Sequence, residues 1–379
     1  MIYWKIQLTP KTPYFFGNER SQAYQDNRTQ KGLLNPYYIP SNEMPAQSAL
    51  FGVLRYLGIH HPTPQFDLTA EDKARIGGQS FDLYNPKENF GMIKQISPLM
   101  IYDQTNHRHC LPAPGIVSAA VHMEKQNQYT SVQTLDGERW LPDSYDSKDS
   151  RFGHFLCPED QTLIEAPFHK IVRVGIGRRA QDYFKREYVI LGDENDPKRV
   201  FSFLFYAATE DSFRPSQEKI VFLGRRKAPF SVQMTRTEEP LTEKELLPVP
   251  VAEGIKKALP SEVIVDGKKR AACYGHVCSD MLYEGDVAEL RRSCCLLMGT
   301  TRDYRVFTTN YQARRFIGSD HPGDRGRYIK REEVLRLLPA GTVLVFRDRA
   351  QQEACKKLLS RSPRFQHGEI AGFNCILYT

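Results

Sequence analysis

Hydrophobic side chains occupy every second position along the first nine residues of the chain. The apolar positions are Ile2, Trp4, Ile6 and Leu8. In an extended segment they would share one face, and the residues between them, mostly polar, would share the other. This alternation predicts a half-buried β-strand at the amino end.

A helical period appears further along. Pro45 suits the first turn of a helix, where its missing N–H is not needed, and Gly58 suits the end of one. Between them, apolar residues recur at helical spacing: Leu50, Val53, Leu54 and Leu57. A strand, a polar loop and a packed helix predict the opening of a β-α-β arrangement.

Many later segments also have the composition and length of strands. They are 98–102, 168–176, 183–191, 201–207, 220–223, 230–234, 263–265, 294–298, 342–346 and 373–378. Tight turns of glycine and basic residues join several of them, which predicts antiparallel pairing. Two segments, 330–338 and 350–359, have amphipathic spacing and are predicted to be helices.

Two stretches break this pattern. Residues from about 60 to 166 are rich in Pro, Gln, Asn and Asp with weak periodicity, and we interpret them as a long loop-rich insertion. Residues 235–250 hold several glutamates and prolines and look like a linker. The prediction is therefore an α+β protein with a domain over 1–240, which contains the insertion, and a second domain over 241–379.

Composition narrows the class of protein. The chain has 379 residues, 40% of them hydrophobic, which excludes a disordered, collagenous or disulfide-scaffold protein. No run of 18 apolar residues and no signal peptide are visible, so no membrane partner is expected. Eight irregularly spaced cysteines without a secretory signal indicate reduced thiols, and hence a cytoplasmic protein.

The net charge of +7 is compatible with nucleic acid or another anionic partner and does not by itself establish either. The distribution says more, because positive charge gathers in three segments, 170–188, 222–230 and 302–327. The candidate binding residues of the first two are Arg173, Arg178, Arg179, Lys185, Arg186, Arg225, Arg226 and Lys227.

The first two basic segments share a layout of an apolar strand, a glycine, two adjacent arginines and then aromatic residues. Glycine lets a backbone approach a phosphate, and the arginine fork matches phosphate oxygens. Aromatic rings can stack unpaired bases, so the combination favours single-stranded RNA. Each turn could equally be an ordinary solvated turn between strands, and the third segment could face a protein.

Catalytic motifs are scarce. The sequence has no phosphate-binding loop, no His-Glu-x-x-His helix and no Gly-x-Ser-x-Gly turn. His107 and His109 could form an acid–base or metal site, but we interpret the segment 107–110 as a solvated loop without a nearby carboxylate. The sequence does not exclude a catalytic histidine for RNA cleavage, and the candidates are His60, His61, His154 and His169.

Cysteines near the middle of the second half offer one metal candidate. Cys273, His276 and Cys278 precede the doublet Cys294 and Cys295. Structural zinc normally uses Cys-x₂₋₄-Cys pairs, and an adjacent doublet has awkward geometry for one ion. We therefore expect these cysteines to be buried thiols and the protein to bind no metal and no cofactor. A zinc ion at these cysteines remains an alternative.

Several motifs resemble a known group of proteins. The segment 8–21, with its Phe-Gly-Asn-Glu-Arg loop, followed by 39–40 and the helix at 45–56, resembles the RAMP superfamily of CRISPR proteins. The similarity is to the Cmr-type subunit of type III effector complexes that caps the 5′ handle of the crRNA. Segments 173–176, 223–226, 338–343 and 371–374 are similar to it as well. The stretch 60–166 matches nothing in that group, and 368–372 is a degenerate version of its glycine-rich loop.

The resemblance implies two ferredoxin-like (RRM-like) domains with antiparallel sheets and no active site. The implied function is a non-catalytic crRNA-binding subunit that anchors the guide 5′ handle in antiviral defence. Its implied partners are crRNA, the large polymerase-like subunit and the backbone RAMP subunits. Carried onto this chain, the implied RNA-binding residues are Arg20, Gln47, Ser48 and Arg55, together with the two Gly-Arg-Arg turns.

Two alternatives remain beside this interpretation. One is a RAMP endoribonuclease that processes repeat RNA, which would need an essential histidine. The other is a protein-interaction module whose basic surface balances an acidic partner. Arg55 lies off the apolar stripe of its helix, so it could reach an RNA or be an ordinary solvated residue.

Overall fold

We analysed a computed structural model of the chain. The structure describes residues 1–17, 38–60, 68–77, 89–114, 128–143, 154–176, 183–217, 219–224, 227–283, 285–299, 302–308, 329–361 and 363–379. The description below is confined to these residues.

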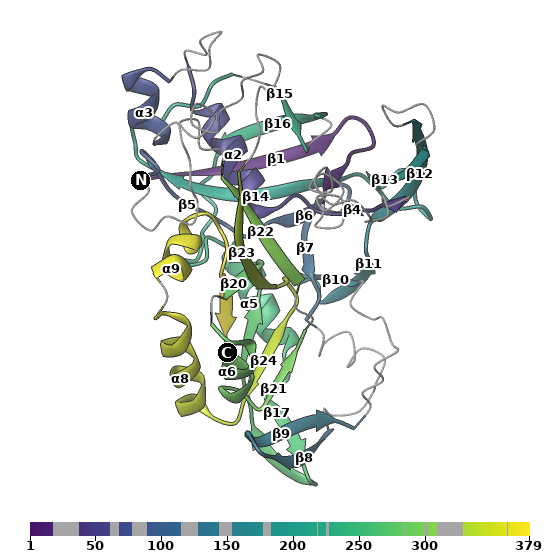
Figure 1. Cartoon of the computed structure of the whole chain (residues 1–379), viewed down its shortest axis with the longest axis vertical. Helices are drawn as coiled ribbons and strands as arrows, with labels where there is room; N and C mark the ends of the chain where they lie inside the picture. Colours follow the sequence, from purple (N-terminus) through teal and green to yellow (C-terminus); the bar gives the residue numbers. More distant parts are fainter. Residues whose placement is uncertain are drawn as a thin grey trace.

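A nine-stranded sheet crosses the upper part of the molecule in Figure 1. Its order is β11-β10-β7-β6-β14-β1-β16-β15, and β5 also pairs with β14. The strands are β1 (Ile2–Pro10), β5 (Ile93–Ile96), β6 (Met100–Asp103), β7 (Arg108–Pro112), β10 (His154–Cys157), β11 (Thr162–Glu165), β14 (Phe201–Thr209), β15 (Ile220–Leu223) and β16 (Ala228–Arg236). Each strand pair within it is antiparallel.

The amino-terminal alternation produces the centre of this sheet. Ile6 and Leu8 of β1 pair in register with Phe205 and Phe203 of β14, and all four side chains are buried. Helix α2 (Gln47–Leu57) contributes its apolar residues to the same core, as its spacing predicted. The half-buried strand and the helix are both confirmed.

Five smaller sheets complete the fold, with orders β12-β13-β3, β2-β4, β18-β17-β8-β9, β21-β24-β19-β25 and β20-β23-β22. Their strands are β2 (Phe16–Gly17), β3 (Tyr38–Ile39), β4 (Ser41–Asn42), β8 (Gln128–Thr134), β9 (Gly137–Pro142), β12 (Phe168–Ile176), β13 (Tyr183–Leu191), β17 (Glu262–Val265), β18 (Lys268–Ala271), β19 (Cys273–Val277), β20 (Met281–Tyr283), β21 (Leu296–Met298), β22 (Arg302–Thr308), β23 (Ile329–Leu338), β24 (Val343–Phe346) and β25 (Ile376–Tyr378). The β12–β13 hairpin extends to one side of the central sheet, and β8 and β9 lie at the opposite end of the long axis from β15 (Figure 1).

Helices are few in the described part of the chain. Besides α2 they are α3 (Ala70–Ile76), α5 (Val249–Ala258), α6 (Val287–Arg292), α8 (Arg349–Leu359) and α9 (Pro363–Ile370). None of these described helices is long and apolar enough to span a membrane. The α+β class and the antiparallel sheets are therefore confirmed. The two ferredoxin-like domains and the boundary at 240 stay predictions.

Three local expectations were wrong. Most of the described part of 60–166 is strand rather than loop, and β5, β6, β7, β10 and β11 all join the central sheet. The segment 330–338 is strand β23 rather than a helix, because β20 and β22 pair with it on both sides. Part of the expected linker, from Val249 onward, begins helix α5, whose proline falls in a first turn that tolerates it.

The hydrophobic core is continuous between the two halves of the chain. Met100 and Leu204 of the central sheet lie in one apolar cluster with Val251 and Ile255 of α5 and with Leu377 of β25. Burying these side chains together stabilises the position of the carboxyl-terminal half under the central sheet. The central sheet, α5 and β25 are therefore held together by a shared apolar core.

Candidate nucleic-acid interface

The first basic segment forms the β12–β13 hairpin, paired over its whole length from Phe168 opposite Leu191 to Ile176 opposite Tyr183. In an antiparallel pair, residues directly opposite each other share a face of the sheet. Arg173 lies opposite Arg186, so the two guanidinium groups project from the same face of the hairpin. By the same register, Glu187, the single acidic residue of the two strands, belongs to the opposite face.

The arginine-bearing face is built on two aromatic rings. The Arg173 guanidinium lies 5.2 Å from the centroid of the Tyr188 ring, and that of Arg186 lies 5.2 Å from the centroid of Phe15. The two rings are 6.1 Å apart. The attraction between a cation and a ring face helps to hold both guanidinium groups in place. We call Phe15, Arg173, Arg186 and Tyr188 the arginine–aromatic cluster.

The second basic segment meets this cluster at Gly224, the residue that follows β15. Gly224 has a φ of +71°, and a β-carbon on it would lie 2.4 Å from the carbonyl oxygen of Phe15. Only glycine allows both that conformation and that approach. Lys227 then closes the turn, with its N–H donating to the Gly224 carbonyl at 3.0 Å. The turn between β15 and β16 is thereby fixed against the residue that supports Arg186.

The opposite face of the hairpin carries a buried polar contact. Glu187 is 4% exposed, accepts a hydrogen bond from the Tyr38 hydroxyl and from the Ser41 N–H, and lies 3.5 Å from Lys170 Nζ. Lys170 also pairs with Glu43 at 3.1 Å. Burial pushes the pKa of Lys170 down, but its bonds to both glutamates outweigh this and raise the pKa. This contact ties β3 and β4 to β13.

The structure thus brings together part of the predicted RNA-binding set. Arg173, Arg186 and Lys227 lie on or beside the arginine–aromatic cluster, whereas Lys185 lies opposite Val174 on the other face of the hairpin. Five predicted residues lie outside the described part of the chain: Arg20, Arg178, Arg179, Arg225 and Arg226. The described neighbours of the last two, Gly224 and Lys227, are at the cluster.

The three predicted residues on α2 are placed elsewhere. Gln47 is 5% exposed and its amide donates to the Ser97 carbonyl at 2.5 Å, beneath Gly372. The Arg55 Nε donates to the Ile76 carbonyl at 3.0 Å, at the end of α3. Ser48 is partly exposed in the first turn of α2. Gln47 and Arg55 therefore have packing contacts inside this chain, which the sequence pattern did not reveal.

Phe15 is the residue of the cluster that sequence reasoning missed. The motif Tyr14-Phe15-Phe16 was identified only through its resemblance, not as a support for arginines. A weak signal was present, because Tyr14 and Phe16 are buried in the central core, which directs the intervening Phe15 to the other side. Its contacts with Arg186 and Gly224 join segments far apart in sequence, and no local pattern reports such contacts.

No protein-family model matches the chain, and no curated protein matches it in sequence. Solved structures do match. A chain of the type III-B Cmr-beta bound to cognate target RNA aligns with 98% of this chain over 96% of its own length, with 12% identity and a TM-score of 0.48. A second Cmr-beta structure, bound to cognate target RNA and AMPPnP, gives 98% and 95% coverage, 11% identity and a TM-score of 0.47. The resemblance predicted from the motifs is confirmed as a resemblance.

The prediction that residues 107–110 form a solvated loop was wrong for His109. This residue is 5% exposed on β7, and its Nδ1 lies 2.5 Å from the Glu159 carboxylate. Its Nε2 lies 3.2 Å from the Tyr206 hydroxyl, which donates to Glu239. Burial favours the neutral form of Glu159, but the bond and charge of His109 outweigh it and lower the pKa of Glu159.

The other candidate histidines have varied surroundings. His60 Nε2 lies 2.5 Å from the Arg214 carbonyl, and His169 Nδ1 lies 3.2 Å from Glu194. His154 is partly exposed on β10. His61 lies outside the described residues. Of these, His169 falls on the arginine-bearing face of the hairpin, because it is an even number of residues from Arg173 on β12.

All eight cysteines are buried free thiols. Burial raises the pKa of the thiols of Cys294 and Cys295, which keeps both protonated at neutral pH. Within the residues that the structure describes, no group of three or more His, Cys, Asp or Glu side chains could hold a metal ion. The cysteines considered for zinc are placed as packing residues here.

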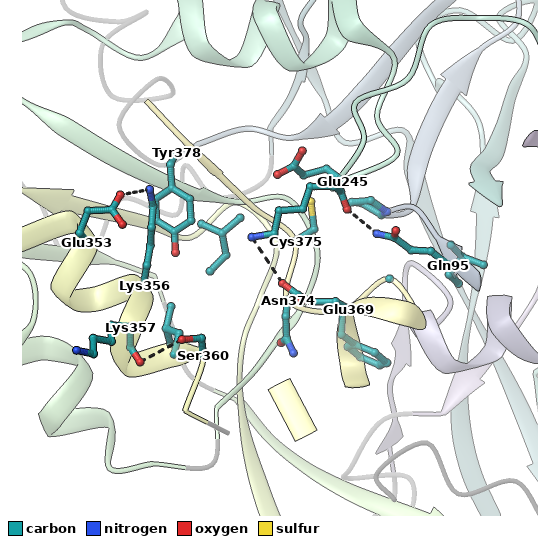
Figure 2. Close-up of a pocket in the computed structure, with 17 residues that line it drawn as sticks. Gln95, Glu245, Glu353, Lys356, Lys357, Ser360, Glu369, Asn374, Cys375 and Tyr378 are labelled. Carbon is teal, nitrogen blue, oxygen red and sulfur yellow. Dashed lines mark hydrogen bonds and ion pairs between the residues drawn. The ribbon is translucent and has the colours of Figure 1, made fainter. Parts of the chain in front are cut away.

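A cavity of about 540 Å³ lies between α8, α9 and the edge of the central sheet. Figure 2 shows its lining, which includes three lysines and three glutamates: Lys244, Lys356, Lys357, Glu245, Glu353 and Glu369. Lys356 pairs with Glu353 at 2.5 Å (Figure 2). Lys244 Nζ lies 4.0 Å from the Glu369 carboxylate. Because these charges balance one another, the cavity lacks the cationic excess that a phosphate-bearing ligand needs.

Proposed function

We propose that this protein is a non-catalytic RNA-binding subunit of a type III CRISPR ribonucleoprotein. It anchors the 5′ handle of the crRNA and contacts the large polymerase-like subunit and the backbone RAMP subunits in the cytoplasm. The observation that carries the proposal is the arginine–aromatic cluster. Three segments that the sequence motifs single out separately meet there around Phe15.

The chemistry of the cluster suits a phosphate chain. Guanidinium groups donate two parallel hydrogen bonds to phosphate oxygens, and a glycine turn lets a strand approach the backbone. Among the described residues of β12 and β13, the face with Arg173 and Arg186 carries no acidic residue. An anion therefore meets no repulsion there from the hairpin itself.

Holding the RNA without cutting it is the second part of the proposal. His109 is buried away from the arginine face, and its ring is engaged by Glu159 and Tyr206. His169 is the histidine that keeps the endoribonuclease alternative testable, because it shares the arginine face and is paired with Glu194. We expect repeat RNA to stay intact on incubation with the protein, and the His169→Ala variant to bind RNA as the parent does.

The binding test uses the triple variant Arg173→Ala, Arg186→Ala, Lys227→Ala. Losing three phosphate contacts should flatten the dependence of log K on log salt by about 2, at about 0.7 for each single-strand contact. The binding constant at low salt should fall with it. A reduced slope in this variant is the specific signature of cationic contacts.

The matched control is Lys257→Ala, Lys268→Ala, Lys269→Ala, which removes the same three charges from exposed positions of α5 and β18. Both variants change the net charge from +7 to +4, since 7 − 3 = 4. Equal losses of RNA affinity in the two would show that total charge, not the cluster, governs binding. That result would favour a module whose basic surface only balances an acidic partner.

A further inference from the structure

The aromatic residues of the basic segments differ greatly in how much of their rings they expose. Phe16 and Phe230 belong to the central core, and Phe15 is 3% exposed beneath Arg186. Phe15, Phe16 and Phe230 are buried, so they cannot accept a base, and one contact of the partly buried Tyr188 is with Arg173. Phe222 differs from all of them, because 63% of it is exposed.

The exposure of Phe222 follows from its place in strand β15. Val221 and Leu223 are buried in the central core, so the alternation of the strand turns Phe222 to the opposite side of the sheet, with Ile220. β15 pairs with β16 on one edge and ends the sheet order on the other. Among the described residues, no strand lies beyond it to cover the ring.

Among the described residues, the charged residues beside Phe222 in sequence are lysines. Its cross-strand partner is Pro229 of β16, whose carbonyl accepts from the Lys11 N–H at 2.9 Å on the side of β16 away from β15. Lys219 precedes the strand, and Lys227 closes the turn that follows it. None of the described residues of β15 and of the adjoining part of β16, 219–224 and 227–231, is acidic.

We infer that Phe222 is a base-stacking subsite, which takes one unpaired nucleobase of the same RNA strand whose phosphates lie on the arginine–aromatic cluster. The inference rests on the proposed function and adds a contact to it. Phe222 precedes Gly224 by two residues, about 7 Å along a strand, and Gly224 contacts Phe15. Every base has a π face, so this subsite accepts any base without reading its identity.

Positive surroundings favour RNA over a protein as the occupant. A protein partner would bury Phe222 through apolar contact, for which any side chain of similar size is adequate. A base needs a flat ring, so leucine and tyrosine at this position separate the two occupants. Ile220 is exposed on the same side of the same strand and lies two residues further from Gly224 than Phe222 does. It therefore provides an apolar control.

The experiment compares Phe222→Ala, Phe222→Leu, Phe222→Tyr and Ile220→Ala in the full chain. The probe is a short single-stranded RNA with 2-aminopurine at successive positions, whose fluorescence falls when the base stacks. We expect Phe222→Ala and Phe222→Leu to weaken binding roughly 5- to 150-fold and to abolish the quenching at one position. Phe222→Tyr and Ile220→Ala should behave as the parent.

The salt dependence distinguishes this inference from the function on which it rests. Phe222→Ala removes no charge, so the slope of log K against log salt should stay that of the parent while the triple cationic variant loses slope. If Phe222→Leu binds RNA as tightly as the parent, the stacking subsite is refuted and the arginine–aromatic cluster is untouched. If the parent protein binds no RNA, both proposals fail together.

Discussion

Replacing Gly224 by alanine tests the contact that joins the two basic segments. Its φ of +71° costs an alanine about 1 kcal/mol, because the β-carbon crowds the following carbonyl. The new β-carbon would also lie 2.4 Å from the Phe15 carbonyl oxygen and 3.2 Å from the Phe16 ring. Forcing the backbone apart there should cost about 1–3 kcal/mol more. The expected loss of folding free energy is therefore about 2–4 kcal/mol.

The matched control is Gly267→Ala, which separates backbone strain from the clash. Gly267 has a φ of +73°, and a β-carbon there meets no atom within 4 Å. Only the strain of about 1 kcal/mol should appear in that variant. Urea unfolding gives the comparison, with Trp4 reporting on the central sheet and Trp140 on the β8–β9 end. Equal stability losses in the two variants would refute the close approach of Gly224 to Phe15.

Two further predictions concern pH and buried charge. His276 is 1% exposed, and burial lowers its pKa from 6.5 to about 3. Below pH 6.5 this histidine is protonated in the unfolded chain and stays neutral in the native state. The free energy of unfolding should therefore fall by about 1.4 kcal/mol for each pH unit between pH 6.5 and pH 3. His276→Leu should flatten this part of a stability–pH curve, and an unchanged slope would contradict the burial of the ring. Asp103 is fully buried, and burial acts to raise its pKa, but hydrogen bonds from Arg199 at 2.7 Å and from Asn106 outweigh this and lower it. Asp103→Asn should cost about 2–4 kcal/mol at neutral pH, because Arg199 and Arg108 each lose a buried counter-charge, although Asp193 still pairs with Arg199. The contribution of Asp103 should disappear as pH falls below the ordinary value of 3.8, so a urea-midpoint difference between the two proteins that persists at low pH would contradict the ion pair.

Local periodicity predicted elements well where one face of a single segment meets the core. The strands at Phe168–Ile176, Tyr183–Leu191 and Ile220–Leu223 have the predicted bounds. It failed where pairing decides the conformation. Strand β23 has a spacing that also fits a helix, and only its partners β20 and β22 settle the matter. Within 60–166 the segment 98–102 predicted β6, but the polar composition concealed β5, β7, β10 and β11, which also join the central sheet.

In the candidate site, too, the sequence predicted local features but not the contacts between distant segments. Composition alone marked Arg173 and Arg186 as candidates, since a basic strand with aromatic residues is a local feature. That they share a face depends on the register of the hairpin, which a sequence cannot fix without its turn. The partnership of His109 with Glu159 is of the same kind, because it joins residues on different strands. Sequence reasoning therefore found the charges and missed what holds them.

The contacts of Arg173 and Arg186 with aromatic rings affect the free energy with which the proposed interface would bind RNA. A flexible arginine must be immobilised on binding, at a cost of about 0.5–1.5 kcal/mol for each side chain. Arg173 and Arg186 already lie over rings, and the ring under Arg186 belongs to the buried Phe15, whose backbone carbonyl lies against Gly224. Part of that ordering cost is thus met during folding rather than during binding. If the proposed function is correct, each of these two arginines should therefore contribute more to RNA affinity than a flexible surface arginine would.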